Sequence, residues 1–220
     1  MLRTLLDLLY PRTCLSCAEL LQTGELDLCA RCERTIERAK VETLTRGPLS
    51  EIVALFIFEE HSPSRVLLHT LKYGAMPSLG TRLGRALGEL VVERGIRADL
   101  VIPVPLSRRK KRERGFNQAA RVGGGVSAAT GIPMAEDLVQ RIRDTASQTT
   151  LSAEARSQNV RGAFAVSPAG VKTLDGTSCL LIDDVVTTGA TVLECASVMR
   201  SAGASRVIAC AVAIAKRSPA

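Results

Sequence analysis

Apolar and polar residues follow two different patterns along this chain. Continuous apolar runs with polar or turn-forming residues at their ends predict buried strands over residues 52–58, 99–104, 178–183 and 206–215. Apolar residues at three- and four-residue spacing predict helices over residues 65–74, 78–95, 117–130 and 190–202. Shorter strands are expected within 136–144 and at 162–166, and a polar, mobile loop over 144–160. The strand–helix alternation from residue 99 onward predicts an α/β fold, a mostly parallel sheet flanked by helices.

The first 45 residues differ in pattern from the rest of the chain. Leu2, Leu5, Leu6 and Leu9 predict a short amphipathic helix that docks on the protein. The turn-forming segment TRGPLS, 45–50, marks a boundary between an N-terminal module, 1–45, and a larger domain, 46–220. No apolar run approaches the roughly 18 residues of a membrane span, and no secretory signal is visible. A cytoplasmic location without a membrane span is therefore expected.

Four of the seven cysteines form a regular motif near the N-terminus. Cys14, Cys17, Cys29 and Cys32 follow the pattern C-x2-C-x11-C-x2-C. Two such pairs can place four thiolates around a tetrahedral zinc ion. Two disulfides or a redox pair are the alternatives, but a reducing cytosol disfavours disulfides and a redox CxxC is normally single. The motif predicts structural zinc, with no open position for catalysis.

The positive charge of the chain is concentrated in one segment. The net charge is +7, and RRKKRER at 108–114 holds six basic residues and one acidic residue, a net +5. A cationic loop after a strand suggests a phosphate-rich ligand at one place. A solvated charge run and a binding site for nucleic-acid phosphates are the alternatives.

Two adjacent acids, Asp183 and Asp184, end the apolar run at 178–183. The segment VVTTGAT, 185–191, then leads into the next predicted helix, whose first amides can bind a phosphate. Carboxylates beside a phosphate repel it unless they face vicinal hydroxyls of the same sugar. Ribose 5-phosphate meets this condition, whereas a solvated strand end is the simpler interpretation.

These residues also carry a family resemblance. LLIDDVVTTGAT resembles the motif of type I phosphoribosyltransferases that binds 5-phosphoribosyl 1-diphosphate (PRPP). Together with the cysteine motif, LKYG at 71–74, PVPLSRRKKRERGFNQA at 103–119 and RSQNVRGAF at 156–164, the chain resembles the ComF family, also called ComFC or GntX-like. That family is phosphoribosyltransferase-like and is associated with DNA uptake in natural transformation, or competence.

The resemblance implies roles for individual residues. Asp183 and Asp184 would hold the ribose hydroxyls, and the 5-phosphate would lie on Thr187, Thr188, Gly189, Ala190 and Thr191. Mg²⁺ would arrive with PRPP. Candidates for contacts with the pyrophosphate, from the basic loop and from the flexible loop that closes over the site, are Arg108, Arg114, Asn117, Arg141, Arg156 and Asn159. Lys72 and Tyr73 either line this site or belong to a packed helix end.

Two functions are consistent with this sequence. The first is a Mg²⁺-dependent phosphoribosyltransferase, a pentosyl glycosyltransferase that acts on an unidentified nitrogen acceptor. The second is a non-catalytic protein that handles single-stranded DNA, with a competence helicase as partner, and that uses the fold to sense a ligand. Aromatic residues make up only 3% of the chain, which argues weakly against extensive base stacking. Phe116 is the one evident stacking candidate.

Overall fold

The computed structural model describes residues 11–40, 42–43, 47–74, 76–143 and 153–216. The helix predicted within residues 1–10 lies outside this part of the chain. The elements are, in order, α2 (Ala30–Arg34), β1 (Glu42–Thr43), β2 (Glu51–Phe58), α3 (Pro63–Tyr73), α4 (Pro77–Glu93), β3 (Leu100–Pro103), α5 (Arg108–Arg114), α6 (Gln118–Thr130), β4 (Val139–Arg141), α7 (Ala153–Val160), β5 (Phe164–Val166), α8 (Pro168–Leu174), β6 (Ser178–Val186), α9 (Ala190–Ser201) and β7 (Arg206–Ala215).

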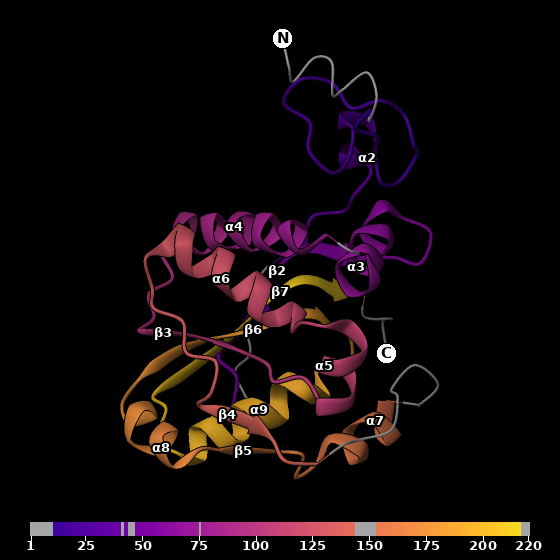
Figure 1. Ribbon diagram of the computed structural model, residues 1–220. Helices are drawn as coiled ribbons and strands as arrows, with labels where there is room; N and C mark the ends of the chain where they lie inside the picture. The colour runs from indigo at the N-terminus through magenta and orange to yellow at the C-terminus, as the bar shows by residue number, and fades with distance from the viewer. Residues whose placement is uncertain (1–10, 41, 44–46, 75, 144–152, 217–220) are drawn as a thin grey trace.

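The main sheet has five strands in the order β1-β2-β7-β6-β3 (Figure 1). Strands β2, β7, β6 and β3 are parallel, and only the short edge strand β1 runs antiparallel. Strands β4 and β5 form a separate antiparallel pair. The predicted α/β fold, with a mostly parallel sheet between helices, is confirmed.

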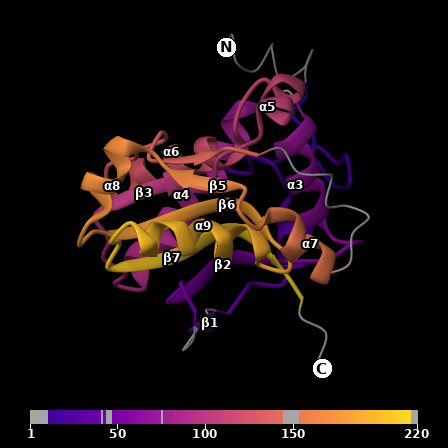
Figure 2. The ribbon, with the colours of Figure 1, turned by 90° about the horizontal axis from the view of Figure 1, so that it is seen from below.

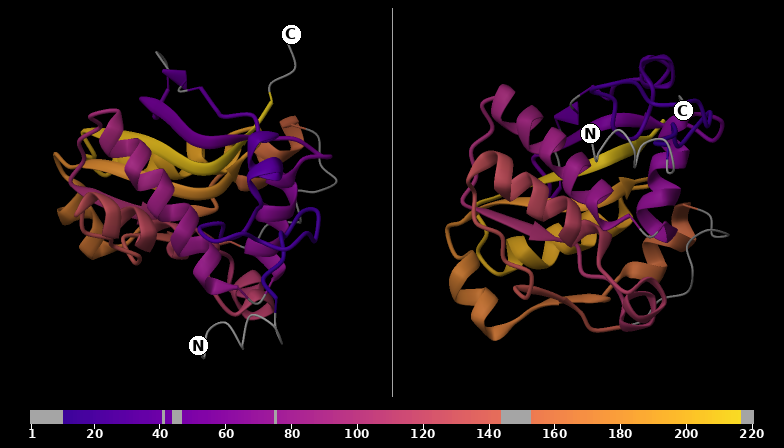
Figure 3. Two further views of the ribbon diagram at one scale, coloured as in Figure 1. Left: turned by 90° about the horizontal axis from the view of Figure 1, so that it is seen from above. Right: turned by 45° about the horizontal axis from the view of Figure 1, so that its top comes forward.

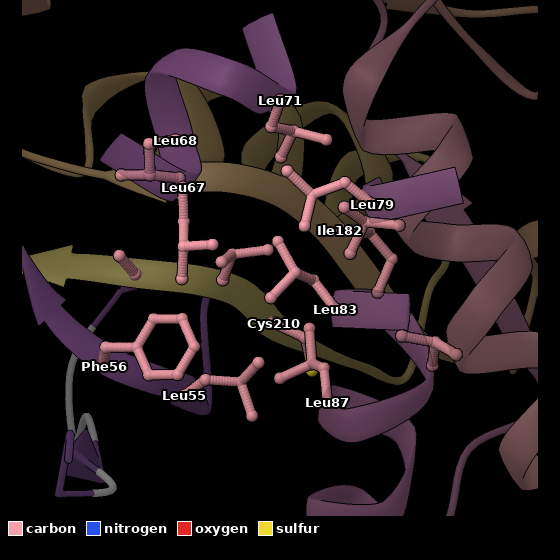
Figure 4. Packing of buried hydrophobic residues seen from close by; sticks show 14 of the residues in the cluster. Leu55, Phe56, Leu67, Leu68, Leu71, Leu79, Leu83, Leu87, Ile182 and Cys210 are labelled. Atoms are coloured by element: carbon pink, nitrogen blue, oxygen red, sulfur yellow. The ribbon is translucent and has the colours of Figure 1, made fainter. Parts of the chain in front are cut away.

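Alternate residues of each strand point to opposite sides of the sheet, so both faces carry apolar side chains, and helices cover both. Leu180 and Ile182 of β6 belong to the core beneath α3, α4 and α6, whereas Leu181 belongs to the core beneath α9. Figure 4 shows leucines of α3 and α4 pointing toward Ile182 and Cys210 on the strands. On the other face, α9 lies along β6 and β7 (Figure 2). The sheet is therefore a rigid platform whose strand ends are fixed in place.

Helices α4 and α6 lie side by side over the sheet (Figure 3), and glycines permit their close approach. A Cβ atom added to Gly125 would lie 2.3 Å from the carbonyl oxygen of Thr81, and one added to Gly84 would lie 2.0 Å from that of Val122. Gly123 instead faces Met134 and the strand residues Val101 and Ile182. The glycine run that weakens α6 as an isolated helix thus serves packing against both a strand and a helix.

Two segments expected to be loops are helical. Residues 108–114 form α5, because the Ser107 side chain accepts a hydrogen bond from the Lys110 amide and Gly115 ends the helix in the left-handed conformation. Residues 153–160 form α7, which buried Val160 anchors, so the predicted loop is wrong there. Residues 144–152 lie outside the described residues. Helix α8, capped by Ser167 and begun by Pro168, was not anticipated.

The cysteine segment packs against the α/β fold rather than standing apart from it. Cys14, Leu28 and Ile36 belong to the same apolar core as the leucines of α3 and α4. Arg82 of α4 donates two hydrogen bonds to the carboxylate of Asp27, one of them 2.9 Å long. The domain boundary near residue 45 stays a prediction. Among the described residues, no helix is long and apolar enough to cross a membrane.

The glycine packing leads to a paired prediction about stability. Gly125→Ala should lower the free energy of unfolding by about 1–3 kcal/mol, because the new methyl group meets backbone atoms of α4. Gly124→Ala, whose Cβ would meet nothing within 4 Å, should instead raise it by about 0.5–1 kcal/mol. Urea unfolding of both variants measures the difference, and equal effects would contradict the packing account.

Candidate phosphate and sugar site

The carboxyl ends of β3 and β6 open into a cavity of about 740 Å³. Parallel strands commonly bind ligands at this end. The cavity is lined by the end of β6, the loop before α9, the segment that joins β3 to α6, and the end of α3. Arg141, the last residue of β4, lines the cavity as well, so four parts of the chain that are far apart in sequence meet at one place.

The acid pair lies at the wall of this cavity. The amide of Asp184 donates a hydrogen bond to Oδ1 of Asp183, 2.8 Å away. Asp184 Oδ2 lies 3.2 Å from Nζ of Lys72, the penultimate residue of α3, and both side chains are largely buried. An ion pair with little water around it is stronger than a surface pair. One acid is thus held by a lysine, while its neighbour has no ion pair among the described residues.

This difference appears in the protonation of Asp183. Burial, and then repulsion from the Asp184 carboxylate, raise the pKa of Asp183 to about 8. The hydrogen bond from the Asp184 amide and the charge of Lys72 oppose the rise without cancelling it. At neutral pH Asp183 is therefore largely protonated, and it can donate a hydrogen bond.

The loop after the acids presents the N-terminus of α9 to the cavity. Gly189 caps the helix with a φ of 79°, a conformation that favours glycine, and it supplies no side chain to cap the first amides. Thr187 and Thr188 are exposed, and the Thr188 hydroxyl accepts only a long hydrogen bond, 3.4 Å, from the Ala190 amide. Open amides at a helix N-terminus with nearby hydroxyls suit a phosphate group.

Cationic side chains also line the cavity. They are Lys72, Arg109, Lys110, Arg114 and Arg141. Burial lowers the pKa of Lys110, and repulsion from Arg114, Arg141 and Lys72 lowers it further. Like charges gathered in this way favour a ligand that carries several negative charges.

The predicted residues divide according to where the fold places them. Asp183, Asp184 and all five residues of 187–191 line the cavity, as do Arg114, Asn117 and Arg141. Arg108 is exposed and is not among the lining residues. Asn159 lies on α7, outside the lining, and its carbonyl accepts a hydrogen bond from Arg143. Arg156 is also on α7, but its side chain lies outside the described part.

Two lining residues have roles that sequence patterns left open or missed. Asn117 caps α6 through a 3.1 Å hydrogen bond from the Ala119 amide, and its Nδ2 donates to the Val104 carbonyl. Gln118 also lines the cavity. Its Oε1 accepts a hydrogen bond, 3.0 Å long, from Arg114. No local pattern signals this contact, because it depends on the bend between α5 and α6.

The four cysteines of the N-terminal motif lie together. Their sulfur atoms are all within 4.8 Å of one another, and those of Cys17 and Cys29 are 3.7 Å apart. Four sulfurs at 2.3 Å from a tetrahedral zinc are about 3.8 Å apart, so the cluster could hold this metal. Burial raises the pKa of Cys14, but hydrogen bonds from the backbone of Cys17, Cys29 and Ser16 outweigh it and lower the pKa to about 6. Burial, and then hydrogen bonds with the other three cysteines, raise the pKa of Cys32 to about 12, so thiolate charge at neutral pH falls on Cys14 rather than on Cys32.

The phosphoribosyl transferase domain family matches residues 128–220 of the chain. This part contains the acid pair and the loop before α9, whereas the cations of α3 and α5 precede it. Residues 128–220 are therefore similar to this domain family.

Relatives extend the similarity into the first half of the chain. DNA utilization protein YhgH of Salmonella typhimurium is 33% identical over 150 residues, which cover 66% of this chain and 64% of that protein. Competence protein F of Haemophilus influenzae is 33% identical over 109 residues, 50% of this chain and 47% of that protein. The chain thus spans less than two thirds of the length of these relatives. The resemblance to the ComF family is confirmed.

A solved structure with a related fold is glutamine PRPP amidotransferase from B. subtilis, complexed with ADP and GMP. It is 20% identical, with a TM-score of 0.44, and the match covers 64% of this chain and 30% of that one.

The raised pKa of Asp183 predicts how stability varies with pH. Its pKa is about 8 in the folded protein against 3.8 for an ordinary aspartate, so between these values the folded state binds more protons than the unfolded state. Stability should therefore fall as the pH rises from about 4 to about 8. Asp183→Asn should remove this pH-dependent change in the free energy of unfolding. Each unit by which the pKa differs between the folded and unfolded states contributes about 1.4 kcal/mol.

Urea unfolding of wild type and variant at pH 5 and pH 8.5 measures this effect. Asp137→Asn, at an exposed position, is the matched control and should keep the pH dependence of the wild type. The account of the acid pair fails if wild type and Asp183→Asn lose the same stability between the two pH values.

Proposed function

We propose that the cavity binds PRPP together with Mg²⁺. In this assignment Asp183 and Asp184 hold the 2- and 3-hydroxyls of the ribose. The 5-phosphate lies on residues 187–191 at the N-terminus of α9. The diphosphate faces Lys110 and Arg109. Mg²⁺ needs oxygen ligands and commonly takes several of them from phosphates, so it would neutralise the diphosphate and lower the charge of the bound ligand.

The observation that carries this proposal is the meeting of three different chemistries in one cavity. Acids favour hydroxyls or cations, an open helix N-terminus favours a phosphate, and clustered cations favour a second anionic group. A sugar with phosphates at both ends and hydroxyls between them matches this order. A plain phosphate or a nucleic-acid backbone would leave the acid pair facing negative charge.

As a phosphoribosyltransferase, the protein would transfer the ribose from PRPP to a nitrogen acceptor. The bond between C1 and the diphosphate oxygen breaks, and positive charge develops on the ribose ring. The cations of α5 stabilise the departing diphosphate, because they are fixed in place before the reaction. The acceptor nitrogen attacks C1 from the other face and then loses its proton. Exclusion of water by the closed site would prevent hydrolysis.

The four-cysteine cluster would bind one structural zinc ion. The spacing of the sulfur atoms fits a tetrahedral thiolate site, and the buried positions of Cys14, Cys29 and Cys32 leave little room for a catalytic ligand. Metal analysis of the reduced protein should find about one zinc per chain. A metal-free protein that keeps its fold would contradict the assignment.

The names of the relatives point to a role in competence or DNA utilization. We propose that this role is part of DNA uptake and is carried out in the cytoplasm. One observation favours the second candidate function, the handling of single-stranded DNA without turnover and with a helicase partner. Arg108, Lys111 and Arg112 are exposed on α5 and do not line the cavity, so they are available to DNA phosphates while the ligand site is occupied.

Calorimetry with PRPP and millimolar Mg²⁺ tests the ligand. Wild type and the exposed-site control Asp137→Asn should bind PRPP, and Asp184→Asn should bind at least about tenfold more weakly, because it loses a charged hydrogen bond to the sugar. No heat from PRPP or ribose 5-phosphate at millimolar concentration would refute the proposal.

Pyrophosphate release with a panel of bases separates the two functions. Turnover that Asp184→Asn abolishes indicates an enzyme. Absence of turnover, with DNA affinity that falls steeply with salt and on neutralisation of Arg108, Lys111 and Arg112, indicates a DNA-handling protein.

A further inference from the structure

We infer that the cavity wall beside Lys72 is a binding site for a planar heteroaromatic ring that presents a carbonyl oxygen. Tyr73, Arg114 and Gln118 form this site, called here the ring site. The step that makes this ring the ribose acceptor rests on the proposed function, whereas ring binding itself does not.

Aromatic side chains are rare in this chain, yet two of them line the cavity. The sequence has two tyrosines, four phenylalanines and no tryptophan. Tyr73 and Phe116 both border the cavity, and Tyr73 is 66% exposed. A large exposed ring beside a ligand cavity offers a face on which a flat ligand can stack.

Arg114 lies over the Tyr73 ring and is held in place. Its guanidinium carbon lies 5.2 Å from the centre of the Tyr73 ring, and its Nη2 approaches the tyrosine hydroxyl at 3.5 Å. Its Nη1 donates to Oε1 of Gln118 over 3.0 Å. Guanidinium groups stack on aromatic rings, so Arg114 packs on one face of Tyr73, and this stacked pair is the platform for a flat ligand.

Gln118 gives the ring site its preference for a ring that carries a carbonyl oxygen. The residue is 2% exposed, and its Nε2 has no hydrogen-bond partner among the described residues. Arginine has only donors, so the amide must turn its oxygen toward Arg114 and leave its NH₂ group free. A buried donor without a partner costs free energy that a ligand acceptor can recover. A ligand reaches the NH₂ group of Gln118 by displacing neighbouring side chains at the cavity wall. A carbonyl oxygen of the ligand can accept a hydrogen bond from this group, whereas an amino group cannot.

The ring site lies next to the proposed sugar site. Tyr73 follows Lys72 directly, and the Lys72 ammonium is 3.2 Å from the Asp184 carboxylate. A ring on this platform would therefore lie beside a ribose held by the acid pair, where an acceptor of the ribose has to be.

Binding of free bases to the full-length, zinc-loaded protein tests the inference without PRPP. Hypoxanthine and uracil carry carbonyl oxygens, whereas adenine carries none. Wild type should bind one or both of the oxo rings about tenfold more tightly than adenine, measured by calorimetry. Decamers of deoxyinosine and deoxyadenosine repeat the comparison with bases supplied by a single strand.

The variants separate stacking from edge recognition. Tyr73→Ala should lose at least about tenfold in ring affinity, Tyr73→Phe should retain it, and Val171→Ala, at an exposed position on α8, is the control. Gln118→Met should bind oxo and amino rings alike. Gln118→Glu keeps an oxygen that accepts from Arg114 but replaces the NH₂ donor with a second acceptor oxygen. This variant should bind adenine, whose amino group is a donor, more tightly than the oxo rings.

The inference is overturned if no base or decamer binds, if Tyr73→Ala binds as wild type does, or if the oxo preference persists in Gln118→Met. Decamer binding alone, with the same dependence on Tyr73 and Gln118, supports the site and identifies a strand as the source of the ring. If PRPP binds and no ring does, only this inference fails. If a ring binds and PRPP does not, only the proposed function fails.

Discussion

Two carboxyl groups side by side at the end of a buried strand are the constraint on which the functional site depends. Asp183 and Asp184 cannot both ionise freely so close together in a partly buried place. Lys72 forms an ion pair with Asp184, and burial together with the neighbouring acid raises the pKa of Asp183 to about 8. The pair is costly to maintain, and a ligand with vicinal hydroxyls gives it favourable partners.

The rest of the fold fixes the surroundings of this pair. Because β3 and β6 are adjacent and parallel, the segment that follows β3 and the loop that follows β6 reach the same cavity. Helix α6, which begins at the cavity, is held against α4 through glycines that allow backbone contact. Helix α3 ends with Lys72 and Tyr73, so its last turn contributes to both the sugar site and the ring site. Packing remote from the cavity thus sets the geometry within it.

Local patterns in the sequence predict the sheet and the acid–threonine loop well, because both depend on neighbouring residues. Apolar runs mark the strands, and the loop before α9 is read directly from TTGAT. Segment 108–114 shows what such patterns miss. A loop has no regular period, so the sequence does not show whether Arg108 or Arg109 faces the cavity. As helix α5 it turns Arg109, Lys110 and Arg114 toward the cavity, and it leaves Arg108, Lys111 and Arg112 exposed. Ser107 and Gly115 were the available signals for that helix.

Contacts between distant segments could not be predicted from the sequence. Lys72 meets Asp184, and Tyr73 meets Arg114, across more than 40 residues of chain. The unpartnered amide of Gln118 depends on which way Arg114 turns, which only the packed structure shows. The fold was therefore readable from periodicity and a motif, whereas the chemistry of the cavity wall required the tertiary structure.

A crystal structure of the protein soaked with PRPP and Mg²⁺ is the most direct measurement of the central claim. The account predicts density for the ribose with its 2- and 3-hydroxyls on Asp183 and Asp184, and its 5-phosphate on the amides at the start of α9. Density for the sugar at any other surface, or a cavity that stays empty at saturating ligand, would contradict it.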